Sequence, residues 1–161
     1  MSNSVAGHRT RAGAVRYVLL ISLALLVSSF IQAPSASAWS ALEFEYASYK
    51  ETQAAFTIWG CDAKTTNTYA QACYNDRDDW FYIWDREDDG QRVAVHWETL
   101  NQTRHGLCVF TDGEPWVGGC NKSISDSVDI RIRAGRCNGS VSPCRQVSDF
   151  HDWTGWDSTD A

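Results

Sequence analysis

The sequence predicts an all-β protein, a small antiparallel β-sandwich of immunoglobulin-like or similar type with three disulfides. One observation is a series of short segments in which apolar and polar residues alternate between turn-forming residues, as in half-buried strands. The other is an even set of six cysteines, all of which follow the first 38 residues. Short strands at this spacing are typical of a β-sandwich, and an even set of cysteines in an exported chain predicts a disulfide framework.

The clearest strand is expected at residues 128–134, where even-numbered positions are apolar and odd-numbered positions are charged. In a strand this alternation turns Ile130 and Ile132 toward a core and the arginines beside them toward solvent. Gly135 follows and marks the end of the segment.

A β-hairpin is expected between residues 80 and 97. Residues 80–84 are aromatic and aliphatic, and residues 92–97 form a second, largely apolar strand. The acidic turn at residues 85–90 joins them, and Gly90 after Asp89 supplies the positive φ that such turns need. We therefore expect these two strands to pair with each other.

Three more strands are expected, two of them at residues 106–110 and 57–59. The third lies at residues 42–46, where apolar and acidic residues alternate. Ser40 and Glu43 also fit the capping box of a helix N-terminus, which leaves a helix as the alternative for this segment.

The spacing of the cysteines favours pairing between neighbours in the sequence. Two intervals enclose eleven residues each, and the third encloses a short run of turn formers. Each closed loop would contribute roughly 2–3 kcal/mol by the loop-entropy model. Other connectivities remain open, and zinc is the alternative for clustered cysteines, although no Cys-x-x-Cys pair is present. The expected disulfides are Cys61–Cys73, Cys108–Cys120 and Cys137–Cys144.

The first 38 residues have the three parts of a secretory signal peptide. A basic stretch precedes an apolar run at residues 17–30, and small residues follow up to Ala38. The apolar run is shorter than the roughly 20 residues that cross a bilayer, which disfavours a membrane anchor. We expect cleavage after Ala38 and a secreted, extracellular product. The expected organisation is a signal peptide at 1–38, a β-sandwich domain at 39–148 and an acidic-aromatic C-terminal segment at 149–161.

That C-terminal segment differs from the rest of the chain in composition. It carries Phe150, His151, Trp153 and Trp156 among several aspartates. Two structures are open for it. It is either a last strand that closes the sandwich or a flexible segment that docks on a partner or on the domain itself.

The charge of the expected mature chain limits its partners. Three of the 14 Lys and Arg and none of the 20 Asp and Glu lie in the first 38 residues, which leaves a net charge of −9. Nucleic-acid phosphates and anionic lipids repel such an anion. We therefore expect neither nucleic acid nor membrane as a partner after signal removal, and no cofactor.

The acidic turn partly matches a calcium loop. Asp85, Glu87 and Asp89 stand at positions 1, 3 and 5 of an EF-hand-like loop, but position 12 is His96 instead of a bidentate Glu. Carboxylates at a solvated turn also lack the environment that separates the pKa values of a glycosidase pair. We therefore expect no metal, with this turn as the only calcium candidate, and no catalytic residues.

Tryptophan is unusually frequent, with eight residues in the expected mature chain. Several are expected in the core, because each buried aromatic adds much apolar area. If Phe81 and Ile83 face inward, their neighbours in the strand form an aromatic ladder on the outer face. Tryptophan and tyrosine are enriched at binding hot spots. The expected aromatic binding residues are Trp80, Tyr82, Trp84, Trp153 and Trp156.

The turns and cysteines between Trp80 and Cys144 resemble those of small exported β-sandwich proteins of actinomycetes, whose functions are mostly unassigned. The likeness rests on the acidic turn ending at Gly90, on Cys108 and Cys120, and on the alternating strand before Cys137. Some proteins of this kind, including the adaptor subunits of umbrella toxin particles, are binding modules with immunoglobulin-like sandwiches. The resemblance implies a module that joins larger secreted partners, and it assigns no individual residue.

These observations favour a secreted, non-enzymatic protein-binding module, either an adaptor or an inhibitor of a hydrolase. Its partner would be another secreted or cell-surface protein. A carbohydrate- or cell-wall-binding domain is the first alternative, because flat aromatic rings near acids and amides suit sugar stacking. A small secreted hydrolase is the second, and it would need a His–Ser contact or a carboxyl group with a shifted pKa.

Overall fold

The computed structural model describes residues 39–52 and 60–159. The expected signal peptide at 1–38 and the expected strand at 57–59 lie outside the described residues. None of the helices in the described part of the chain is both long enough and apolar enough to cross a membrane.

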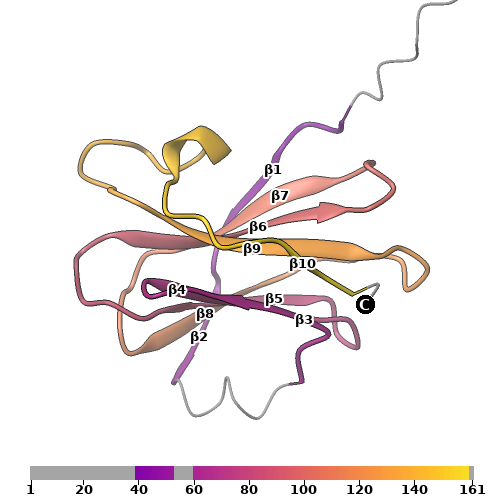
Figure 1. Ribbon diagram of the computed structural model, residues 1–161, viewed down its shortest axis with the longest axis horizontal. Coiled ribbons are helices and arrows are strands. Elements are labelled where there is room, and N and C mark those ends of the chain that lie inside the picture. The colour runs from indigo at the N-terminus through magenta and orange to yellow at the C-terminus, as the bar shows by residue number, and fades with distance from the viewer. Residues whose placement is uncertain (1–38, 53–59, 160–161) are drawn as a thin grey trace, which may run out of the picture. The chain divides into compact units, whose positions relative to one another are not determined.

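The described strands form two five-stranded sheets, which Figure 1 shows as stacked layers. The first sheet has the order β1-β7-β6-β9-β10, and the second has the order β2-β8-β5-β4-β3. The expected all-β sandwich is therefore confirmed. The strands are β1 (Glu43–Tyr46), β2 (Tyr49–Thr52), β3 (Ala63–Thr66), β4 (Ala70–Asn75), β5 (Trp80–Asp85), β6 (Arg92–Thr99), β7 (His105–Phe110), β8 (Trp116–Asn121), β9 (Ile130–Cys137) and β10 (Asp157–Ser158), with one 3-10 turn, η1 (Val147–Asp149).

The N-terminal part of the sandwich contributes one short strand to each sheet. β1 pairs with β7 in parallel, and β2 pairs with β8 in antiparallel orientation. The strand expected at residues 42–46 is thus confirmed, and the helical alternative is wrong. The alternation of Phe44 and Tyr46 with two glutamates decides this segment, because it fits a pleat and does not fit a helical turn.

The expected hairpin between β5 and β6 is wrong, because the two strands lie in different sheets. Phe81 and Ile83 of β5 belong to the same buried cluster as Val93, Val95 and Trp97 of β6. The strands therefore pack against each other across the core instead of sharing hydrogen bonds. The acidic turn between them is an arch from one sheet to the other, and Gly90 has the expected positive φ of 71°.

Strand β9 confirms the clearest sequence pattern. Ile130, Ile132 and Ala134 are fully buried, and the arginines between them lie on the other face. The strand begins two residues later than expected and continues to Cys137, because it pairs with the full length of β6.

All three expected disulfides are present, and no described cysteine is free. Cys108 of β7 and Cys120 of β8 join the two sheets through the core, and both are fully buried. The Cys61–Cys73 bond lies on the outer face of the second sheet, where it packs against Tyr82. The third bond closes the loop between Cys137 and Cys144.

The C-terminal segment ends in a short strand, and the residues before that strand also contact the first sheet. β10 pairs with β9, and His151 forms a β-bridge with Arg136. Phe150 and Trp153 pack with Ala94, Leu107 and Val109 in a second apolar cluster on the outer face of the first sheet. Residues 157–158 therefore form a last strand of the first sheet, and Phe150 and Trp153 before them pack on its outer face.

Gly135→Ala should test how firmly this segment is held. A Cβ at Gly135 would lie 2.5 Å from the Trp153 ring, so the segment must shift. We expect a loss of about 1–3 kcal/mol in unfolding free energy, as for other overpacked sites, measured by urea denaturation. Gly155→Ala is the matched control, because a Cβ there meets nothing within 4 Å. Equal stability of the two variants would show that Trp153 is not held against the sheet.

Candidate functional site

The expected aromatic ladder lies on the outer face of β5 but is largely covered. Phe81 and Ile83 face the core, so their neighbours face outward as expected. Tyr82 is only 9% exposed and stacks on Trp80 with 5.7 Å between ring centroids. Trp84 is half-buried. The Cys61–Cys73 disulfide occupies this face, and its packing leaves little of the ladder in solvent.

Trp153 and Trp156 belong to a separate group on the first sheet. The Arg133 guanidinium lies 4.4 Å from the Trp153 ring centroid and 4.5 Å from that of Trp156. Arg131 lies 4.6 Å from the Trp156 ring. Trp156 is 38% exposed and Trp153 is half-buried. The five aromatic residues expected to bind a partner therefore do not form one patch.

The acidic turn does not bring the ligand atoms of three acidic side chains within 4.8 Å of one another. Asp85 is 2% exposed, and its Oδ1 accepts a hydrogen bond from the Glu87 amide. Asp89 instead pairs with Arg136 at 2.7 Å. Within the described residues, the one group of three His, Cys, Asp or Glu side chains whose ligand atoms meet within 4.8 Å lies elsewhere. The calcium candidate Asp85, Glu87 and Asp89 gains no support.

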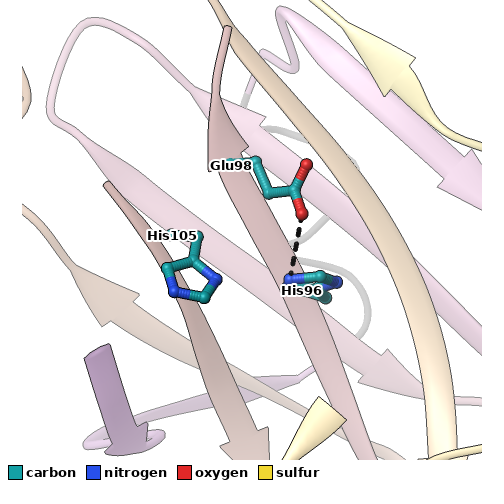
Figure 2. A group of neighbouring side chains, drawn as sticks. All are labelled: His96, Glu98 and His105. Carbon is teal, nitrogen blue, oxygen red and sulfur yellow. Dashed lines mark ion pairs between the residues drawn. The ribbon is translucent and has the colours of Figure 1, made fainter. Parts of the chain in front are cut away.

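That group is formed by His96, Glu98 and His105 on the outer face of the first sheet, as Figure 2 shows. His96 and Glu98 are two residues apart on β6, so they share a face, and His105 of β7 is the register partner of Glu98. Nε2 of His96 lies 3.5 Å from Oε1 of Glu98. The imidazole of His105 points toward His96 from the neighbouring strand.

Contacts around the group fix its side chains. Nε of Arg133 donates a hydrogen bond to Nδ1 of His96 at 3.1 Å, and Nε of Arg131 donates to Glu98 at 2.7 Å. Nε2 of His105 lies 2.9 Å from the backbone oxygen of Ser40, which can only accept, so this nitrogen carries the proton. His96, Glu98 and His105 therefore each have one polar atom engaged from outside the group.

Burial controls the charge of His96, which is 3% exposed. Loss of solvation, followed by repulsion from Arg133, lowers the pKa of His96 to about 3. The imidazole is therefore neutral at physiological pH. Its Nε2 has no hydrogen-bond partner, and a buried polar atom of this kind calls for an explanation.

Sequence reasoning missed this group. In the sequence, His96 stands out only as position 12 of the partial calcium loop. The available signal was the His-x-Glu spacing in a strand, which places both side chains on one face. The contribution of His105 follows only from the pairing of β6 with β7.

The loop closed by Cys137 and Cys144 presents a different kind of surface. Val141 at its tip is 81% exposed, whereas the other exposed large apolar residues of the described chain, Tyr46 and Trp156, are 39% and 38% exposed. The backbone oxygen of Asn138 accepts hydrogen bonds from the amides of Val141 and Ser142, at 3.1 and 3.0 Å. The disulfide and these bonds hold the loop in one turn.

A polar cavity of about 330 Å³ lies beside β4 and the segment before β9. Tyr74, Asp76, Asp126 and Asp129 are among its lining residues. A hydrogen bond that the Asp76 carboxyl group donates to Asp62 raises the pKa of Asp76. The cavity is a cluster of acids without a buried unpartnered donor, and we assign it no ligand.

Comparison with known proteins adds no further assignment. The chain matches no protein-family model, no curated protein and no solved structure.

Proposed function

We propose that this chain is a secreted, non-enzymatic protein-binding module of the adaptor or inhibitor type. It inserts Val141 into a small apolar pocket of another secreted or cell-surface protein. The observation that carries the proposal is the exposure of Val141, 81%, at the tip of a disulfide-closed loop. Three disulfides support an extracellular location, because such bonds persist in oxidising compartments.

The loop is suited to binding because it is already ordered. Ordering a loop on association costs free energy, and a loop held in its bound shape avoids that cost. A disulfide, two backbone hydrogen bonds to Asn138 and a third to its side chain from Ser140 restrain the turn. Val141 is thus an exposed apolar side chain that the restrained loop holds in a fixed place.

Two arginines give the Val141 loop a local positive charge in an acidic protein. Arg92 packs against Gly139 and its guanidinium reaches the Pro143 oxygen, and Arg145 directly follows the loop. Neither arginine forms an ion pair with a carboxylate of the described residues. Opposite charges orient partners during association. The expected pocket is therefore apolar at its centre and acidic at its rim.

Affinity purification from culture supernatant tests this function. We expect the oxidised chain to recover one stoichiometric partner and Val141→Asp to lose it, because a buried unpaired carboxylate opposes docking. Val141→Ala should weaken binding about tenfold, because it removes two methyl groups whose burial is worth roughly 0.8 kcal/mol each. Ser127→Asp adds the same charge on an exposed loop elsewhere and should leave the partner bound. Recovery of the same partner by Val141→Asp would contradict the proposal.

A carbohydrate-binding role is the second candidate, favoured by one observation. Trp156 is 38% exposed and rests on Arg131 and Arg133, so its outer ring face is held in place. Sugars stack on such fixed rings. Addition of cell-wall glycans should then change tryptophan fluorescence in the native chain and not in Trp156→Ala. No change across a glycan panel would remove this candidate.

A further inference from the structure

We propose that His96, Glu98 and His105 form a binding site for a divalent transition-metal ion of the zinc type. The proposal is independent of the protein-binding role, since the site lies on the outer face of the first sheet and needs no partner. Imidazole nitrogen and carboxylate oxygen are donors that zinc prefers. Three protein ligands of this type leave one position of a tetrahedral ion open.

The spacing of the donor atoms suits such an ion. At metal–ligand distances of about 2.0–2.1 Å, neighbouring ligand atoms of a tetrahedral zinc ion lie roughly 3.3 Å apart. Nε2 of His96 and Oε1 of Glu98 are 3.5 Å apart, and the ligand atoms of all three residues lie within 4.8 Å of one another. Small side-chain rotations therefore suffice to close the site.

The outer contacts of His105 and Glu98 leave one donor atom of each for the ion. His105 donates its Nε2 proton to the backbone oxygen of Ser40, so its Nδ1 carries a lone pair. Figure 2 shows the His105 ring directed toward His96. Arg131 binds Oε2 of Glu98 and leaves Oε1 facing His96. Metal-binding histidines and carboxylates are usually oriented by second contacts of this kind.

Nε2 of His96 is a buried nitrogen without a hydrogen-bond partner. This side chain is more than nine-tenths buried, and its Nε2 points toward Glu98 without forming a hydrogen bond. Burial of a polar atom without a partner is rare in folded proteins. A cation bound between Nε2 of His96 and Oε1 of Glu98 would provide the missing interaction for His96.

Arg133 opposes the metal and makes the proposal testable. Its Nε–H donates to Nδ1 of His96, which places the imidazole proton on Nε2. Zinc binding at Nε2 must move that proton to Nδ1 and so break the Arg133 hydrogen bond. Arg131 and Arg133 also place positive charge near the ion. We therefore expect a site of modest affinity that Arg133 weakens.

Zinc titration of the purified, oxidised chain by calorimetry tests the site. We expect one Zn²⁺ per chain and a Co²⁺ derivative with the absorption bands of a tetrahedral ion. His105→Ala should lower zinc affinity at least tenfold, and because His105 is only half-buried, the variant should keep its fold. His151→Ala removes an exposed histidine that pairs with Asp152 and is not part of the group, and it is the control. Absence of zinc binding, or equal losses in the two variants, would overturn the site.

Arg133→Gln gives a second readout that a purely structural group would not produce. The glutamine carbonyl can accept a hydrogen bond from Nδ1–H of His96, and the substitution removes a positive charge. We expect zinc affinity to rise about tenfold, even if the lost contacts with Trp153 and Trp156 lower stability. Unchanged or weaker zinc binding would overturn the assignment of His96 Nε2 as a ligand.

Discussion

Replacement of Trp97 by alanine is expected to lower the free energy of unfolding by about 3–5 kcal/mol, the range for large aromatic residues in a core. Trp97 is the largest fully buried side chain and stacks on Phe81 of the opposite sheet, with 5.2 Å between ring centroids. Its removal would open a cavity between β5 and β6, the two strands that face each other across the sandwich. Urea denaturation followed by circular dichroism measures the effect.

Two control substitutions separate loss of packing from loss of an indole ring. Trp97→Phe keeps an aromatic ring against Phe81 and should cost clearly less than the alanine variant. Trp156→Ala removes an indole that is 38% exposed, and we expect a loss of about 1 kcal/mol or less. Similar losses for Trp97→Ala and Trp156→Ala would contradict the placement of Trp97 at the centre of the core.

Gly106 shows why this tryptophan needs a particular neighbour. A Cβ at Gly106 would lie 2.7 Å from the Trp97 ring and 2.5 Å from the Glu43 backbone oxygen. Glycine therefore allows β1 and the indole to approach the same point of β7. A single sequence does not reveal such a requirement, because Gly106 looks like an ordinary strand boundary.

Features encoded locally could be predicted from the sequence. Alternation over residues 128–134 predicted which side of β9 is buried, because the pleat alone decides it. The three disulfides followed from short intervals between cysteines that turns could close. Strands β1 and β7 were likewise expected from the residues of those segments alone.

Features that depend on partners distant in sequence could not be predicted. The sequence pattern predicts that β5 and β6 are strands but does not predict which strands they pair with. The connection between them was therefore expected to be a hairpin, although it is an arch between the two sheets. The C-terminal segment covers the outer face of β6, which is why His96 and Glu98 are buried there. Tyr82 is likewise buried because the Cys61–Cys73 disulfide, which begins on the neighbouring strand β4, packs against it.

Asp85→Asn is expected to stabilise the protein at neutral pH. Burial raises the pKa of Asp85 to about 6, and the Asp89, Glu114 and Asp88 carboxylates add to the rise, against a hydrogen bond from the Glu87 amide. The folded state therefore binds more protons than the unfolded state between about pH 4 and pH 6. The contribution of Asp85 to the free energy of unfolding is therefore fully present below about pH 4. It is lost as the pH rises through about 6.

A shift from the ordinary value of 3.8 to about 6 corresponds to roughly 3 kcal/mol at pH 7. An asparagine at this position would keep the hydrogen bond from the Glu87 amide and carry no charge, so Asp85→Asn should gain up to that amount at pH 7 and almost nothing at pH 4. Urea denaturation at both pH values measures the difference. Asp88→Asn, on the exposed part of the same arch, should change stability by less than about 0.5 kcal/mol at either pH. A gain of equal size at pH 4 and pH 7 would mean that the charge of Asp85 is not the cause, because a neutral carboxyl group and an amide differ little in solvation.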